Sequence, residues 1–197
     1  MKISGIILAA GESRRMGTLK QLLPYRDKTV IETVVDSFQQ VDLHEIIIVL
    51  GYCAEQIQKT LNGYSIKTVI NEKYCDGMLS SVQCGIESVD AFTDAFLIGL
   101  GDQPFVSTSV IFELLKHFIS QEKGIILPSY GGKRGHPIII HCKYRDDIFR
   151  LDHNIGLKQL IHHNQNDLLV VDVASDVVVR DMDFPEDYER ELRVLKR

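Results

Sequence analysis

The feature that most constrains this chain is an apolar segment that ends in a basic, glycine-containing loop. Residues 3–9 are almost entirely apolar, a short pattern that predicts a buried parallel strand. The loop that follows, residues 10–20, contains Gly11 and Gly17 together with two arginines and a lysine. Glycine permits positive φ and close approach of a ligand, and free N–H groups in such a loop face an anion. The segment therefore predicts a phosphate-binding loop at the end of a strand.

The basic side chains of this loop suit phosphate in different ways. Arg14 or Arg15 can form forked hydrogen bonds to phosphate oxygens, and Lys20 supplies a compact point charge. The P-loop pattern G-x-x-x-x-G-K-[ST] and the dinucleotide fingerprint G-x-G-x-x-G are both absent from the loop. A solvated basic turn after the strand is the alternative that this loop, taken alone, leaves open.

Strand-like and helix-like segments alternate along the rest of the chain. Strands are predicted at 45–50, 65–70, 95–100, 124–128, 137–141, 168–172 and 176–180, the last two as a two-strand unit. Helices are predicted at 29–39, 54–61, 80–89, 107–119, 145–150 and 156–162, and a final helix begins at Pro185. Because repeated strand–helix units build a mainly parallel sheet with helices on both faces, we predict an α/β fold with three layers, α/β/α.

Two strand ends are expected to meet at one edge of this sheet. With right-handed crossovers, ligands bind where the carboxyl ends of parallel strands lie together. The loops after Ala9 and Leu100 both open at that edge, and the second contains Asp102 before Pro104. A carboxylate there can hold Mg²⁺, which takes one or two carboxylates with phosphate oxygens and water. A turn-forming aspartate is the alternative for Asp102.

Three further segments have residue types that suit a ligand site. Ser80 or Ser81, after Gly77, either caps a helix or lies where its N-terminus faces an anion or a base. The cationic loop 132–137 either receives an anionic acceptor or forms a solvated hairpin turn. Asp183 offers a second carboxylate for a metal, or it caps the final helix.

Composition narrows the class of protein. The 197 residues are 45% hydrophobic and 25% charged, as in an ordinary folded domain. The net charge of −5 disfavours nucleic acid and anionic membranes as partners. The four cysteines lack C-x-x-C and zinc-like spacing, and no signal-peptide or membrane-spanning pattern is evident. We therefore expect reduced thiols and a cytoplasmic protein.

The pattern as a whole resembles a known enzyme family. Residues 8–20 resemble the L-A-A-G-x-S-x-R-M-G-x-x-K signature of nucleotidyltransferases related to the molybdenum-cofactor guanylyl- and cytidylyltransferases. Further blocks resemble the family in the same order, at 21–24, 77–81, 101–104, 134–137 and 183–187. The blocks 101–104 and 134–137 look most like the cytidylyltransferase branch, which includes accessory proteins of xanthine dehydrogenase maturation.

The resemblance implies a Rossmann-like nucleotidyltransferase fold and a defined reaction. CTP would give CMP to the phosphate of molybdenum-bearing molybdopterin and release pyrophosphate, for xanthine dehydrogenase maturation in purine catabolism. Arg15, Lys20 and Asp102 would be the catalytic residues, and Mg²⁺ would bind Asp102 and Asp183. Such a step needs positioning and charge stabilisation rather than a covalent nucleophile.

The resemblance also assigns residues to each substrate. The nucleotide-binding residues would be Leu8, Ala9, Ala10, Gly11, Ser13, Arg14, Arg15, Met16, Gly17, Lys20, Gly77, Ser80, Ser81, Gly101 and Asp102. The acceptor-binding residues would be Gln103, Arg134, Gly135, His136 and Pro137. Residues 1–197 would form one domain, with a nucleotide-binding half of about 1–105 and an acceptor-binding half of about 106–197. An apo-molybdoenzyme client would be a further partner.

Two other functions stay open. A guanylyl- or other nucleotidyltransferase with a different phosphorylated acceptor shares these features, because base choice depends on a few contacts in a common fold. A non-catalytic carrier of the molybdenum cofactor belongs to another class. Such a carrier has no need for Arg15, Lys20, Asp102 and Asp183 together, and this combination favours an enzyme. The sequence gives neither the client enzyme nor the oligomeric state.

Overall fold

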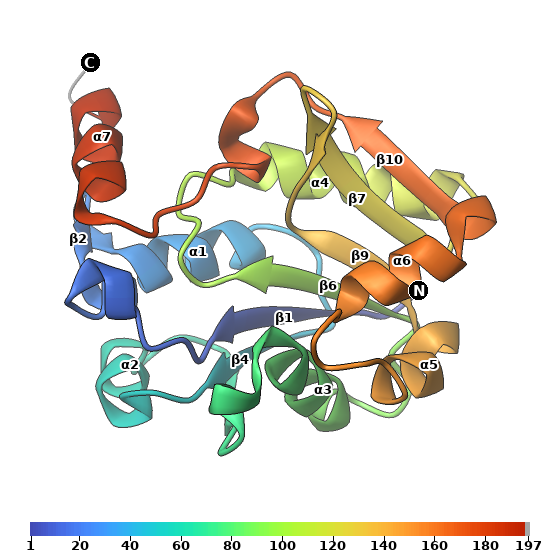
Figure 1. The fold of residues 1–197 in the computed structure, drawn as a ribbon, viewed down its shortest axis with the longest axis horizontal. Helices are drawn as coiled ribbons and strands as arrows, with labels where there is room; N and C mark the ends of the chain where they lie inside the picture. The colour runs from blue at the N-terminus through green and yellow to red at the C-terminus, as the bar shows by residue number, and fades with distance from the viewer. Residues whose placement is uncertain (196–197) are drawn as a thin grey trace.

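Strand β1 (Ile3–Ala9) lies at the centre of the molecule, in the main sheet drawn in Figure 1. The structure, a computed structural model, describes residues 1–195. The main sheet has eight strands in the order β10-β7-β9-β6-β1-β4-β5, with β8 paired to β7. The strands other than β1 are β4 (Glu45–Leu50), β5 (Lys67–Ile70), β6 (Ala95–Leu100), β7 (Ile125–Tyr130), β8 (Lys133–Arg134), β9 (Ile138–His141) and β10 (Leu168–Asp172). A separate ribbon pairs β2 (Pro24–Tyr25) with β3 (Lys28–Thr29).

Most neighbouring strands of the main sheet run parallel. Strand β1 is parallel to both β4 and β6, β4 is parallel to β5, and β10 is parallel to β7. Only β8 and β9 run antiparallel to their partners. The predicted α/β class with a mostly parallel sheet is therefore confirmed.

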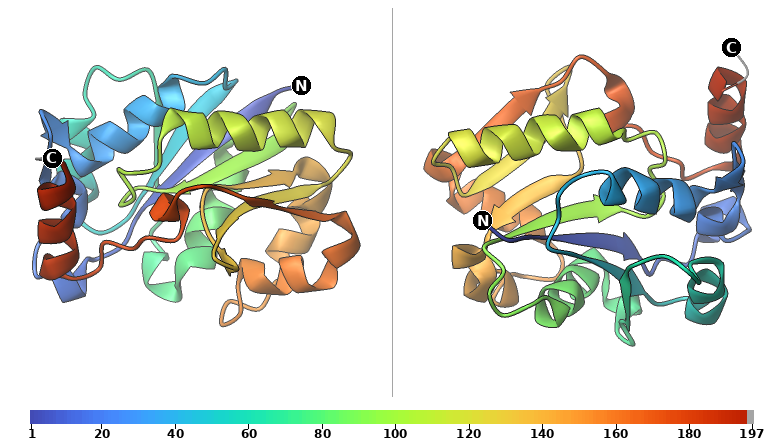
Figure 2. Two further views of the ribbon diagram at one scale, coloured as in Figure 1. Left: turned by 90° about the horizontal axis from the view of Figure 1, so that it is seen from above. Right: turned by 180° about the vertical axis from the view of Figure 1, so that it is seen from behind.

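Helices cover both faces of this sheet, as Figure 2 shows. Their bounds are α1 (Val30–Gln39), α2 (Ala54–Thr60), α3 (Met78–Ser88), α4 (Thr108–Ser120), α5 (Arg145–Phe149), α6 (Leu157–His163) and α7 (Pro185–Leu195). Helices α1, α2 and α4 share one hydrophobic cluster with the sheet, and α3, α5 and α6 share a second cluster. Within residues 1–195, no helix combines the length and the apolar composition needed to cross a membrane.

Helix α1 illustrates how the sequence sets the first residue and the buried face of a helix. Thr29 and Glu32 form a capping box, in which each side chain bonds the other residue's backbone N–H. The buried face of the helix then packs on β6, where Phe38 lies over Gly99. A Cβ at Gly99 would come within 2.5 Å of the Phe38 ring. This close packing fixes the position of β6, whose carboxyl end leads to Asp102.

The segment after β10 differs from the prediction. We predicted a second strand at 176–180, but Asp176–Val178 is a 3₁₀ turn and β10 pairs with β7 instead. The Arg180 guanidinium bonds Asp176 four residues earlier, which stabilises a turn rather than an extended strand. Residues 173–184, here called the strap, run from the sheet edge to the N-terminal loop and lead into α7 (Figure 1). The strap is what brings the C-terminal carboxylates to the start of the chain.

Candidate active site

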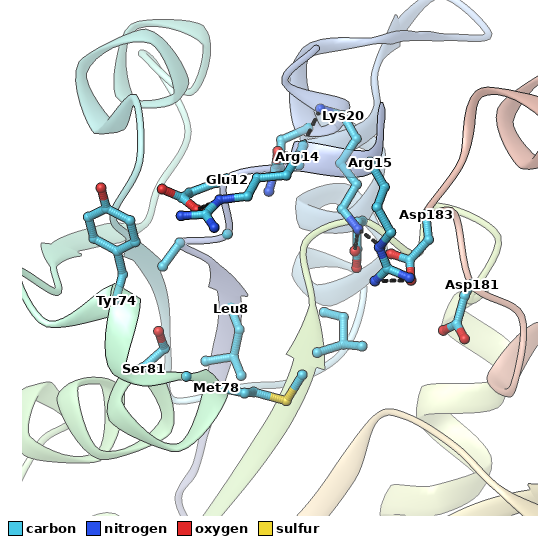
Figure 3. Close-up of a pocket in the computed structure, with 17 residues that line it drawn as sticks. Leu8, Glu12, Arg14, Arg15, Lys20, Tyr74, Met78, Ser81, Asp181 and Asp183 are labelled. Carbon is cyan, nitrogen blue, oxygen red and sulfur yellow. Dashed lines mark hydrogen bonds and ion pairs between the residues drawn. The ribbon is translucent and has the colours of Figure 1, made fainter. Parts of the chain in front are cut away.

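A pocket of about 560 Å³ lies where the loops after β1 and β6 meet. It is lined by Leu8, Ala10, Gly11, Glu12, Ser13, Arg14, Arg15, Lys20, Gln21, Tyr74, Gly77, Met78, Ser81, Leu100, Asp102, Asp181 and Asp183. Figure 3 shows Arg15, Lys20 and Asp183 together on one side of this pocket and Tyr74 and Ser81 on the other. The predicted meeting of the two loops at one sheet edge is therefore present.

The charged side of the pocket is built around the Lys20 ammonium. This group contacts the carboxylates of both Asp102 and Asp183, and it lies 3.1 Å from Asp183 Oδ1. Arg15 Nη2 lies 2.7 Å from the other oxygen, Asp183 Oδ2. The Lys20 side chain is only 11% exposed, whereas Arg15 is 62% exposed. The two carboxylates thus lie close enough together to share one cation.

Proton affinities on this side of the pocket are shifted by burial and by neighbouring charge. Burial acts to lower the pKa of Lys20, but Asp102 and Asp183 together outweigh it, so this pKa is raised. Partial burial raises the pKa of Asp181, and the nearby carboxylates Asp183 and Asp102 raise it further. The surroundings therefore favour the charged form of Lys20 and disfavour the charged form of Asp181.

The predicted phosphate-binding loop is shaped by Ser13 and Gly17, which both have left-handed backbone conformations, with φ of 54° and 66°. The Ser13 hydroxyl donates to Gln21 Oε1 at 3.3 Å and accepts from the Lys20 backbone N–H at 3.3 Å. This hydroxyl thereby ties the loop to the turn that carries Lys20. Gly11 needs no positive φ, and a Cβ there would meet nothing within 4 Å. Of the two glycines in the loop, Gly17 therefore has a positive φ and Gly11 does not, and Ser13 is the other loop residue with a positive φ.

The opposite wall is organised by Asn71, a buried residue just after β5. Asn71 Nδ2 donates to Ser80 Oγ at 2.9 Å and to Ser81 Oγ at 3.0 Å. The prediction that one of these serines caps the helix is wrong. Helix α3 begins earlier, with Gly77 at its N-cap at φ 96°, so both serines lie in its first turn. Ser81 lines the pocket, and Ser80 lies behind it.

Asp102 and Asp183 could hold a metal ion in this pocket. Both reach one cation already, and carboxylates are ligands that Mg²⁺ accepts together with phosphate oxygens and water. In the described part of the chain, no group of three or more His, Cys, Asp or Glu residues is arranged for a metal. The Asp183 carboxylate contacts Lys20 and Arg15, while Asp187 in the first turn of α7 accepts the backbone N–H groups of Asp183 and Phe184.

A second cavity of about 750 Å³ adjoins the first and shares Met78 with it. Helix α3, strands β7 and β9, and the segment around α6 give it apolar side chains, and Arg134 and His136 also line it. Burial lowers the pKa of His136, although a hydrogen bond with the Ile98 backbone opposes the shift. His136 Nδ1 has no hydrogen-bond partner among residues 1–195.

The structure brings together most, but not all, of the predicted site residues. Five of the predicted nucleotide-binding residues do not line the first pocket: Ala9, Met16, Gly17, Ser80 and Gly101. Of the predicted acceptor residues, Arg134, Gly135 and His136 line the second cavity. Gln103 and Pro137 instead border a void of about 10 Å³ near α1. Gln103 Nε2 donates to the Arg180 carbonyl at 3.0 Å, so it holds the strap.

Sequence reasoning missed several residues of the first pocket: Glu12, Gln21, Tyr74, Met78, Leu100 and Asp181. Most of these are neighbours in sequence of residues that were predicted. Asp181 belongs to the same acidic segment as Asp183, and that segment was the signal available for it. Tyr74 had no such signal, because it reaches the pocket from a turn whose position depends on packing against Gly51.

Comparison with known sequences gives a family and several relatives, among them the following two. The sequence profile of the MobA-like NTP transferase domain matches residues 5–168. The molybdenum cofactor cytidylyltransferase of Escherichia coli (strain K12) is 27% identical over 187 residues, covering 94% of this chain and 93% of that protein. The nicotine blue oxidoreductase of Paenarthrobacter nicotinovorans is 32% identical over 152 residues, covering 73% and 72%.

Comparison with solved structures gives the same fold over almost the whole chain. The crystal structure of Rv0371c from Mycobacterium tuberculosis H37Rv is similar, with a TM-score of 0.85, 29% identity and 98% of each chain covered. A manganese complex of Rv0371C has a TM-score of 0.80 and 28% identity, covering 98% of this chain and 99% of that one. The nucleotidyltransferase fold expected from the sequence is thereby confirmed.

Proposed function

This chain belongs to the family of MobA-like NTP transferase domains, and from that premise we propose that it is a molybdenum-cofactor cytidylyltransferase. It transfers CMP from CTP to the phosphate of molybdenum-bearing molybdopterin, and it releases pyrophosphate. The product serves the maturation of a xanthine dehydrogenase-type enzyme. The observation that carries the proposal is the cluster of Arg15, Lys20, Asp102 and Asp183 in one pocket. Two cations beside two carboxylates complement a triphosphate that carries a metal ion.

Each charged residue has a task in this reaction. Arg15 and Lys20 bind the β- and γ-phosphates and offset the charge that develops on the departing pyrophosphate. Lys20 acts more strongly per contact, because its surroundings are drier than those of Arg15. Asp102 and Asp183 hold the divalent cation, for which we propose Mg²⁺. When bound, such a cation supplies Lewis-acid and template chemistry to the triphosphate.

The base and ribose lie at the other side of the pocket in this proposal. Tyr74, Gly77 and Ser81 line that side, away from Lys20 and Asp183 (Figure 3). Gly11 leaves open space beside the pocket, so the ligand can approach the loop backbone. In this proposal the α-phosphate lies between the two sides of the pocket, near Met78.

The acceptor is proposed to occupy the second cavity. Its apolar walls suit a heterocyclic body, and Arg134 at its border suits an anionic phosphate. Because the two cavities share Met78, an acceptor phosphate in the second cavity can approach a nucleotide in the first. Positioning of the two substrates then provides a large part of the rate enhancement.

The test is to incubate the protein with Mg²⁺, molybdenum cofactor and each nucleoside triphosphate separately. We expect pyrophosphate and the cytosine dinucleotide with CTP. Transfer of GMP without transfer of CMP would identify a guanylyltransferase instead. Tight binding of the cofactor without pyrophosphate from any nucleotide would identify a carrier.

The similarity to the nicotine blue oxidoreductase supports a candidate function of another class. Reduction of a dye has no need for two carboxylates paired with Arg15 and Lys20, and for this reason we favour nucleotide transfer. Oxidation of a reduced nicotinamide by the protein in the presence of a quinonoid dye, with no pyrophosphate from any nucleotide, would reverse this preference.

A further inference from the structure

The position that a metal ion would take in the first pocket is filled by a side chain of the protein itself. The Lys20 ammonium contacts both Asp102 and Asp183, the two carboxylates able to hold a cation there. A Mg²⁺ ion needs oxygens at about 2.0–2.1 Å in near-octahedral geometry. The ammonium and the metal ion therefore cannot both lie between these carboxylates.

A metal ion that binds without a nucleotide gains few protein ligands in return for displacing the Lys20 ammonium. It would gain two carboxylates and no third protein ligand, since residues 1–195 arrange no larger group for a metal. It would also displace an ammonium on a side chain that is only 11% exposed. A cation moved off its partners in so dry a place loses charge pairing without regaining full hydration.

A triphosphate changes this balance. Its oxygens can receive the displaced ammonium of Lys20, and the Arg15 guanidinium can turn from Asp183 to the same phosphates. The carboxylates are then free for the metal, which also gains phosphate oxygens as ligands. When the metal ion and the triphosphate bind together, the ammonium pairs with phosphate oxygens and the carboxylates pair with the metal ion. Each charged group therefore keeps a partner of opposite charge.

We propose that Lys20 is an internal counterion that blocks the metal position until a nucleoside triphosphate arrives, so that metal and nucleotide bind as a pair. This inference rests on the proposed function, because it takes a triphosphate as the second ligand. By reciprocity, the metal must strengthen nucleotide binding by the same factor as the nucleotide strengthens metal binding.

The test measures Mn²⁺ binding without nucleotide, from the loss of the spin-resonance signal of free Mn²⁺. Lys20→Met keeps most of the apolar stem and removes the charge, so we expect it to bind Mn²⁺ about ten- to a hundredfold more tightly than the wild type. Adding Asp102→Asn to this variant is expected to abolish the gain. Lys28→Met is the matched control with no expected change, because Lys28 pairs with Asp36 away from the pocket.

A second measurement separates this inference from the proposed function. Binding of labelled CTP to the wild type is measured by equilibrium dialysis with Mn²⁺ and with a chelator, and we expect binding to require the metal. Absence of CTP binding in both conditions would contradict the proposed function. The comparison of Mn²⁺ binding between Lys20→Met and the wild type would still test whether Lys20 blocks the metal position. Wild-type affinity for Mn²⁺ in Lys20→Met, or a gain that survives Asp102→Asn, would overturn the inference. Lys20→Gln answers the same question if Lys20→Met fails to fold.

Discussion

Glu191 holds the guanidinium of Arg180 with both carboxylate oxygens, each 2.9 Å from Arg180 Nη1. Glu191 is the buried residue of α7 and is 3% exposed, and Arg180 lies in the strap. The pair therefore fastens the last helix to the segment that presents Asp183 to Lys20. Because Asp181, the residue after Arg180, lines the pocket, the pair anchors the strap beside the candidate site.

Replacing Glu191 by Leu is expected to destabilise the protein. The change leaves Arg180, whose side chain is 23% exposed, with Asp176 as its remaining carboxylate partner. Removing one partner of a largely buried pair lowers the free energy of unfolding by about 2–3 kcal/mol. Urea denaturation measures the effect. Glu189→Gln breaks an exposed pair with Arg193 and should lower the free energy of unfolding by less than about 1 kcal/mol. An equal loss of stability in the two variants would mean that burial does not strengthen the Arg180–Glu191 pair.

Asp102→Asn is expected to impair turnover much more than folding. The amide keeps the shape of the side chain but removes a charge proposed to hold the metal ion. Loss of one such electrostatic contact lowers kcat by about 10²–10³. Pyrophosphate release and the melting temperature should be measured on the same preparation. A fall in melting temperature that accounts for the lost activity would make Asp102 a structural residue.

Asn71→Ala is expected to raise the KM for the nucleotide. Asn71 connects β5 to the first turn of α3 through Ser80 and Ser81, and its loss leaves these buried hydroxyls without their donor. A buried hydrogen bond left unmade costs about 1–3 kcal/mol, part of which appears as poorer positioning of the wall that carries Ser81. Steady-state kinetics on the variant checks the prediction. Gln58→Ala, which removes an exposed hydrogen bond to Thr68, is the control and should leave KM unchanged.

Gly11→Ala is expected to fold normally and to bind nucleotide weakly. A Cβ at Gly11 meets nothing within 4 Å, and the residue has no positive φ, so stability should change by less than about 0.5 kcal/mol. The added methyl group occupies space that the proposed ligand needs beside the loop. Thermal melting and equilibrium dialysis with CTP make the comparison. Unchanged CTP affinity would show that the nucleotide does not approach Gly11.

Stability is expected to fall as the pH drops from about 7 to 5, in part because of His136. Burial lowers the pKa of His136 in the folded protein, whereas an unfolded histidine binds a proton near pH 6.5. Below that pH the unfolded state takes up a proton that the folded state does not. The contribution is thus complete above pH 6.5 and is lost on acidification, on the order of 1 kcal/mol. Urea titrations of His136→Asn at several pH values should show a shallower acid slope; an unchanged slope would contradict the prediction.

The strands and the first pocket were predictable because their signals are local. Residues 3–9 have an apolar run typical of a strand covered on both faces, and the polar residues after such a strand lie at the sheet edge. Asp102 follows from the same argument applied to β6. Their meeting in one pocket required no knowledge of any distant contact.

The errors fall where a distant partner decides the local structure. Ser80 looks like a helix cap in sequence, but Asn71 draws its hydroxyl into a buried network. The segment 176–180 has the apolar content of a strand, yet ion pairing of Arg180 folds it into a turn. Gln103 lies beside Asp102 in sequence but bonds the strap and lines neither of the two large cavities. Asn71 and the strap are not sequence neighbours of the residues they bond, and the Asp176–Arg180 pair, although only four residues apart, gives no sequence pattern that distinguishes a turn from a strand.

The bond between Lys20 and Asp183 joins positions 163 residues apart. A ribosome that has synthesised the chain only as far as β10 has made every strand of the main sheet but not Asp183. The Lys20 ammonium of such a nascent chain has Asp102 as its carboxylate partner, and the pocket still lacks Asp181 and Asp183. The order of synthesis thus delays completion of the site until the strap has been made, after every strand of the sheet that receives it.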